Sequence, residues 1–111
     1  MGQKTVFYYR YYYRYQFQTC FFGKGIPALV NLLDSELEDV LVNAVNAVRV
    51  MCTENSANQN AVAEEGGIDS LVEFLSVSSD ILQAASAAAI AALCCKNESN
   101  QNAVVAEGAV K

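Results

Sequence analysis

The 111-residue sequence contains no histidine, no tryptophan and a single proline, and only 17% of its residues are charged. Histidine is the commonest general base and the commonest metal ligand, so its absence removes the usual basis for either kind of site. No C-x-x-C pair occurs, and the chain has no nucleophile–base pair, phosphate loop or dinucleotide fingerprint. We therefore expect no catalytic residues, no metal, no cofactor and no enzymatic activity.

The charge is distributed unevenly along the chain. Residues 1–22 carry three bases and no acid, whereas residues 23–111 carry four bases and twelve acids. An acidic body of this kind repels phosphate backbones, so nucleic acid is not an expected partner. The four cysteines are expected to be reduced and structural, which favours the cytosol or the nucleus. They are Cys20, Cys52, Cys94 and Cys95.

A repeat of 42 residues organises most of the chain. A shift of 42 places residues 55–68 on residues 97–110 with eight of fourteen positions identical, including the phrase N-Q-N-A-V. The same shift aligns residues 25–33 with 67–75, and 40–52 with 82–94. A period that holds over three blocks indicates repeated structural units. We predict a partial unit at 23–54, a complete unit at 55–96 and the first helix of a truncated unit at 97–111.

Each unit is predicted to contain a short, a medium and a long helix. Residues 26–33 carry apolar side chains at i, i+3, i+4 and i+7, and Pro27 stands just inside the start of this medium helix. The long helix follows Ser35-Glu-Leu-Glu38, which has the pattern of a capping box. It is apolar on almost every side, so we expect other helices to cover it.

The short helix is predicted to begin at Asn55 in one unit and at Asn97 in the next, because asparagine is a favoured N-cap. Gly66 and Gly67 follow it, where a sharp turn asks for residues free to adopt positive φ. We expect the amides of the N-Q-N-A-V phrase to begin and solvate this helix, while its alanine and valine turn inward.

This succession of helices resembles the armadillo repeat. The residues that carry the resemblance are the glycine turn, the helix GIPALVNLL and the long helix NAVNAVRVMC. The sequence of the long helix is similar to that of ankyrin-and-armadillo-repeat proteins. The resemblance covers about residues 23–111. It implies an all-α, right-handed superhelix of about two repeats, whose third helices line a concave groove that binds a protein or peptide. Such units also pack end to end with further repeats or self-associate.

The resemblance also indicates where a ligand would bind. Armadillo proteins that carry nuclear-import cargo present a tryptophan and, four residues later, an asparagine from the third helix. Here Asn46 and Val50 occupy these positions in one unit and Ala88 and Ala92 in the next, so import-signal binding is not expected. Positions at 4–3–4 spacing share one helix face. In the two long helices the residues at this spacing are Asp39, Asn43, Asn46 and Val50, then Ile81, Ala85, Ala88 and Ala92. We interpret these residues as the lining of the groove. The alternative is that they are merely exposed positions of a degenerate repeat.

Residues 1–22 form a leader of a different kind, since ten of the eleven aromatic residues lie in residues 7–22. Arginines and tyrosines make it a poor membrane span, but they suit an interfacial anchor. A second hypothesis is therefore a membrane-peripheral adaptor that is anchored by this leader. The 42-residue shift places residues 16–26 on residues 58–68, so the end of the leader is expected to fold as a short first helix, while the alternation of Tyr13, Tyr15 and Phe17 suits a strand equally well. In either case we expect the leader to cover the open end of the repeats.

Overall fold

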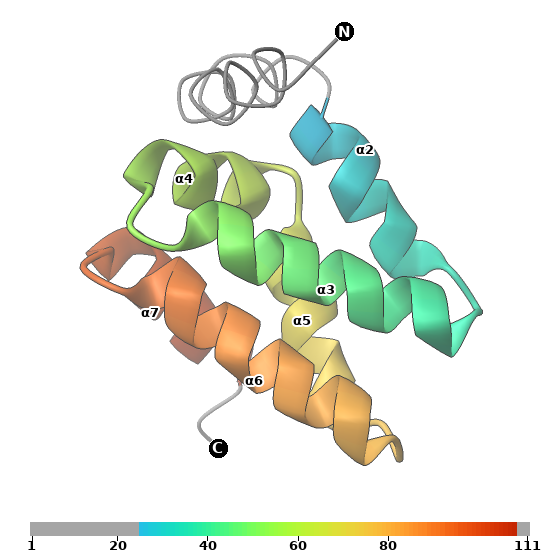
Figure 1. Cartoon of the computed structure of the whole chain (residues 1–111). Coiled ribbons are helices and arrows are strands. Elements are labelled where there is room, and N and C mark those ends of the chain that lie inside the picture. The colour runs from blue at the N-terminus through green and yellow to red at the C-terminus, as the bar shows by residue number, and fades with distance from the viewer. Residues whose placement is uncertain (1–24, 109–111) are drawn as a thin grey trace, which may run out of the picture.

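The computed structural model describes residues 25–108, so the aromatic leader lies outside the described residues. Within them the fold is all-α, as predicted, and contains no strand (Figure 1). The predicted handedness of a superhelix stays a prediction. The helices are α2 (Ile26–Asn31), the 3-10 helix η2 (Leu32–Asp34), α3 (Glu38–Cys52), α4 (Ser56–Glu64), α5 (Gly67–Phe74), α6 (Asp80–Cys94) and α7 (Glu98–Ala106).

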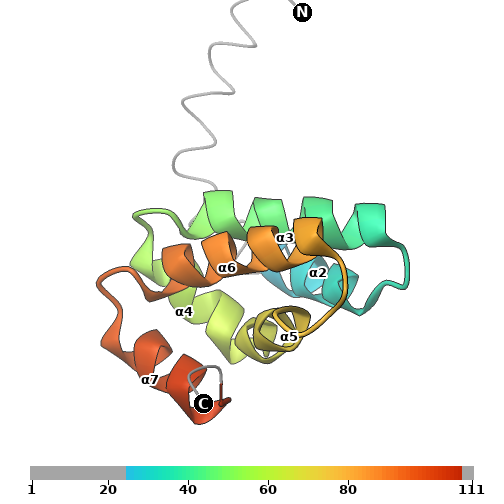
Figure 2. The same ribbon diagram turned by 90° about the horizontal axis from the view of Figure 1, so that it is seen from below.

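The helices recur with the period of the sequence. Helices α3 and α6 begin and end 42 residues apart, and so do α4 and α7. The long helices α3 and α6 run side by side, and α4, α5 and α7 lie in a layer beneath them (Figure 2). Equivalent positions in the two units therefore have equivalent places in the fold, which allows one unit to be compared with the other.

The predicted caps were partly right. The side chains of Asn55 and Asn97 accept hydrogen bonds from backbone N–H groups three residues later, each at 3.0 Å, as expected of N-caps. The predicted capping box was wrong. Helix α3 begins at Glu38, and its N-cap position is occupied by Leu37, whose side chain makes no capping hydrogen bond. The Ser35 hydroxyl instead accepts a hydrogen bond from the Leu37 N–H at 3.1 Å.

A continuous core joins the two units. The fully buried side chains come from α3 and α6, the third helices of the two units, and from the helices beneath them. They include Val45, Val48, Leu71 and Leu93. Ala89 of α6 is also fully buried, because small side chains let helices approach closely. Among the described helices none is long and apolar enough to cross a membrane.

Candidate protein-binding surface

Three of the predicted groove residues lie in an open groove between α2 and α3, which is not the groove predicted across the third helices. The groove has a volume of about 760 Å³. Asn43 is exposed, Asn46 is half-buried and Val50 is 59% exposed. Neither asparagine side chain makes a hydrogen bond with another described residue. The groove is lined by Leu29 and Leu32 on one side and by Asn43, Asn46, Ala47 and Val50 on the other.

The other predicted residues do not line this groove. Asp39 is exposed in the first turn of α3, where its charge suits the helix dipole. On α6, Ile81 is 67% exposed and Ala88 is exposed, but Ala85 is only 8% exposed and belongs to the core. Ala92 is half-buried and packs against the core. Equivalent positions thus differ in exposure because α6 packs against α3, whereas no described helix covers the corresponding side of α3.

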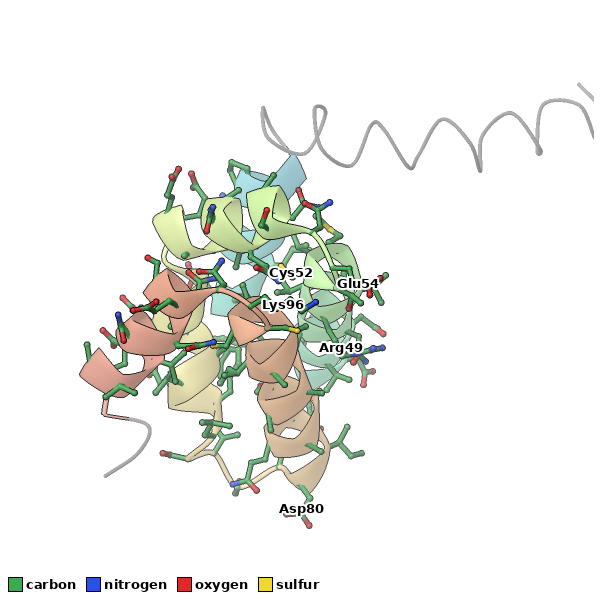
Figure 3. All side chains as sticks on the ribbon, turned by 90° about the vertical axis from the view of Figure 1, so that its left-hand side faces the viewer. Arg49, Cys52, Glu54, Asp80 and Lys96 are labelled. Atoms are coloured by element: carbon green, nitrogen blue, oxygen red, sulfur yellow. The ribbon has the colours of Figure 1, made fainter. Side chains whose placement is uncertain are left out.

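Sequence reasoning did not single out Arg49, which is the only basic residue of α3. Its side chain points outward from the helix, and it stands near the C-terminal end, where a positive charge is favourable (Figure 3). The sequence did offer a signal, because Arg49 is the only charged residue in the block 40–52. Arg49 gives the outer side of α3 one positive group.

The junction between the two units is held by buried amides. Gln59 is only 2% exposed, and its Nε2 donates to the carbonyl oxygens of Cys52 at 3.0 Å and Ala92 at 2.9 Å, with a longer contact to that of Cys95 at 3.3 Å. Its Oε1 accepts from Asn97 Nδ2 at 3.0 Å. One side chain therefore ties the ends of both long helices to α4.

Asn100 completes this junction from α7. Its Nδ2 donates to the carbonyl oxygens of Gln59 at 3.2 Å and Leu93 at 2.9 Å. Asn58, one period earlier, is fully buried and donates to the Met51 carbonyl at 2.9 Å. The expectation that the amides of the N-Q-N-A-V phrase solvate the short helix was therefore wrong for these three residues, whereas Asn60, Gln101 and Asn102 are exposed as expected. They satisfy backbone groups that packing removes from water.

The cysteines differ in accessibility and in acidity. Cys52 is fully buried, Cys94 is half-buried and Cys95 is exposed, and all three are free thiols. Burial raises the pKa of Cys52 to about 12 and also raises the pKa of Cys94. A thiol that stays protonated is a poor nucleophile and a poor metal ligand. Among residues 25–108 no group of three or more potential ligands could hold a metal ion.

We expect Cys52 to react with thiol reagents only when the protein unfolds, whereas Cys95 reacts in the native state. The folded pKa of Cys52 lies above its usual value of 9.0, so its contribution to stability is complete below pH 9. Between about pH 9 and pH 12 that contribution falls by about 1.4 kcal/mol per pH unit, because the unfolded thiol ionises first. Peptide-resolved alkylation with and without denaturant measures the protection. Native-state labelling of Cys52 at the rate of Cys95 would contradict it.

The geometry defines a class: a helical repeat protein in which stacked three-helix units share one core. No protein-family model matches the chain. Two human proteins match parts of it. The chain is 54% identical over 37 residues, or 33% of its length, to ankyrin and armadillo repeat-containing protein, and 47% identical over 49 residues, or 44% of its length, to armadillo repeat-containing protein 3.

These matches cover 3% and 6% of the two human proteins, so the chain spans only a small part of the relatives that it matches. The partial homologues are armadillo-repeat proteins, and they confirm the resemblance of these repeats to that family.

Proposed function

We propose that this chain is a non-catalytic protein-interaction module that binds a peptide or a partner helix across its third helices. Armadillo-repeat homologues imply an interaction scaffold in general. The observation that carries the finer proposal is the surface formed by α3 and α6, which run side by side (Figures 1 and 2). Asn46 and Ala88 occupy equivalent places on these two helices and both remain accessible to solvent.

The chemistry of this surface suits a backbone better than a specific side chain. The amides of Asn43 and Asn46 offer both donors and acceptors, so they can pair with the N–H and C=O groups of an extended segment. The alanines of α6 leave room for the segment to lie close to the helix. Arg49 supplies one positive charge beside them. We infer a partner segment of moderate polarity with an acidic group near one end.

The test is crosslinking capture of partners with the wild type and with the double variant Asn46→Arg/Ala88→Arg. Two long cations on the proposed surface are expected to reduce partner capture at least about tenfold without changing the fold. The control is Asn31→Arg/Ala106→Arg, which makes the same two chemical changes at exposed positions on α2 and α7. Partners that persist with the double variant, or that the control loses equally, would rule out this surface.

The membrane-peripheral alternative is favoured by one observation, the ten aromatic residues interspersed with Arg10 and Arg14 in residues 7–22. It predicts that the full chain co-sediments with anionic liposomes. Replacing both arginines with glutamate should then abolish co-sedimentation, because anionic headgroups attract the arginines. The protein-interaction proposal predicts no liposome binding at all.

A further inference from the structure

The open groove between α2 and α3 carries apolar side chains that a folded protein ordinarily covers. Leu32 is 47% exposed and Val50 is 59% exposed, and both line the groove. One period later, Phe74 stands in the place of Leu32 and is only 9% exposed, and Leu71 stands in the place of Leu29 and is fully buried. Apolar side chains gathered in one exposed groove are typical of a contact surface. The groove therefore indicates contact with a segment outside the described residues.

The size and polarity of the groove suit aromatic rings that carry a polar group. Its volume of about 760 Å³ falls within the range of about 300–1,000 Å³ in which a pocket buries a drug-sized molecule. Leu29, Leu32 and Met51 give it an apolar lining, to which Asn43 and Asn46 add two side-chain amides. The ring of a tyrosine packs against apolar side chains, and its hydroxyl donates to or accepts from an amide. Several tyrosine and phenylalanine rings would satisfy both parts of the lining.

The leader of this chain supplies such rings. All six tyrosines lie in residues 7–22, together with every phenylalanine except Phe74. The leader is joined to the groove directly, because Gly25 is one of the residues that line it. Gly23 and Gly25 flank Lys24, and glycine allows the chain to turn sharply there. A segment held by so short a connection has an effective concentration on the order of millimolar, so even a weak contact is well populated.

The charges near the groove are opposite to those of the leader. Residues 34–39, which join α2 to α3, carry four exposed acids and no base, whereas the leader carries three bases and no acid. From Ile26 to Asp34 the helices α2 and η2 rise about 15 Å. About five extended residues or ten helical residues cover that length. Arg14 precedes Gly25 by more than this, so it reaches the acidic connection whether the leader forms a strand or a helix.

We propose that residues 7–22 dock into the chain's own groove, with aromatic rings against Leu29, Leu32 and Val50 and with the arginines toward residues 34–39. The docked leader would cover Asn43 and Asn46, which also belong to the surface proposed for the partner. A partner must then displace the leader from α3, so the leader regulates access to that surface. This regulatory consequence rests on the proposed function, whereas the docking itself does not.

A tryptophan introduced into the leader reports on the docking, because the chain contains no other tryptophan. Phe17 is the suitable position. The 42-residue shift places it on the buried Gln59, and in a strand it would share one face with Tyr13 and Tyr15. In the full chain, Phe17→Trp is expected to emit at shorter wavelength than in urea and to be protected from acrylamide quenching. The protection should be the same from about 1 to about 100 µM protein, because the contact is intramolecular.

Val50→Arg in the Phe17→Trp protein is expected to lower the equilibrium constant for docking at least about tenfold, because docking would then bury an unpaired charge. The matched control is Val105→Arg. It makes the same change at a valine that is also 59% exposed but lies on α7, outside the groove, so the tryptophan should stay protected. Far-UV circular dichroism checks that each variant folds. If Val50→Arg does not fold, Leu32→Arg takes its place.

Four outcomes would overturn the proposal. The first is a tryptophan that is as exposed in the folded protein as in urea, and the second is protection that survives Val50→Arg or is lost equally with Val105→Arg. The third is protection that disappears on dilution, which would assign the groove to the leader of a second copy. The fourth is protection that appears only with anionic liposomes, which would assign the leader to a membrane surface. No partner is present in this experiment, so failure of docking is distinguishable from failure of partner capture.

Discussion

Replacing Gln59 with alanine is expected to lower the free energy of unfolding by about 3–5 kcal/mol, the largest effect of any single substitution considered for this protein. The Gln59 side chain is buried and bonds to carbonyl oxygens near the ends of both α3 and α6. Alanine would remove a donor from the Ala92 carbonyl and would leave the Cys52 carbonyl with only the longer bond from the Asn55 N–H at 3.3 Å. It would also remove one of the two acceptors of Asn97 Nδ2. Each buried polar group without a partner costs about 1–3 kcal/mol.

The period supplies a matched control. Gln101→Ala makes the same chemical change at the equivalent position, where the side chain is exposed and makes one hydrogen bond. It is expected to cost less than about 1 kcal/mol. Urea denaturation monitored by circular dichroism measures both values. Equal destabilisation by the two variants would show that the buried amide does not hold the units together.

Gly67→Ala is expected to destabilise the fold by about 2–3 kcal/mol, more than Gly66→Ala at about 1 kcal/mol. A Cβ at residue 67 would lie 2.5 Å from Cγ1 of Val62 and 3.1 Å from the Val62 carbonyl oxygen. Val62 is fully buried and β-branched, so it has little freedom to move away. Gly66 has a φ of +85°, but a Cβ there would meet no atom within 4 Å.

Thermal unfolding of the two variants and of Gly66→Asn tests this order. Asparagine tolerates the left-handed conformation, so Gly66→Asn is expected to cost less than Gly66→Ala. A larger loss for Gly66→Ala than for Gly67→Ala would mean that the turn conformation dominates and the close approach of α5 to Val62 does not. The sequence suggested positive φ for both glycines, but only Gly66 adopts it.

The 42-residue period predicted the helices well because it reports on local structure. The N-caps, the place of Pro27 inside α2 and the buried Cys52 all follow from residues near in sequence. The predicted capping box failed for a local reason as well, since Leu37 stands where the second unit has the N-cap Ser79. Ser35 lies two residues before the N-cap position, so its hydroxyl accepts the Leu37 N–H in the preceding turn and does not cap the helix.

The buried amides could not be predicted from sequence windows. Gln59 bonds to carbonyls 33 and 36 residues away, so its environment exists only after the units have packed. An N-Q-N phrase is ordinarily a polar surface segment. The repetition of the phrase in each unit was the available signal. Asn58 and Asn100 make equivalent bonds to the Met51 and Leu93 carbonyls, whereas among the described residues only Gln59 bridges two units.

Helical spacing predicted groove residues on both α3 and α6, and the two sets differ in exposure for a related reason. Helical spacing placed Asn43, Asn46 and Val50 on one face, and all three line the groove. The same spacing treated Ala85 as equivalent to Asn43, but α6 has a neighbour on that side and α3 has none among the described helices. Sequence equivalence thus fixes the position of a residue in its unit, while its exposure depends on what the adjoining unit covers.

The central claim is that the exposed side of α3 and α6 holds a protein partner. Site-specific photocrosslinking tests it most directly, with a photoreactive residue placed at position 88 on α6 or at position 106 on α7. Both positions are occupied by exposed alanines, so neither label disturbs the core. The account predicts partner crosslinks from position 88 and none from position 106. Crosslinks from position 106 alone, or equal yields from both, would contradict it.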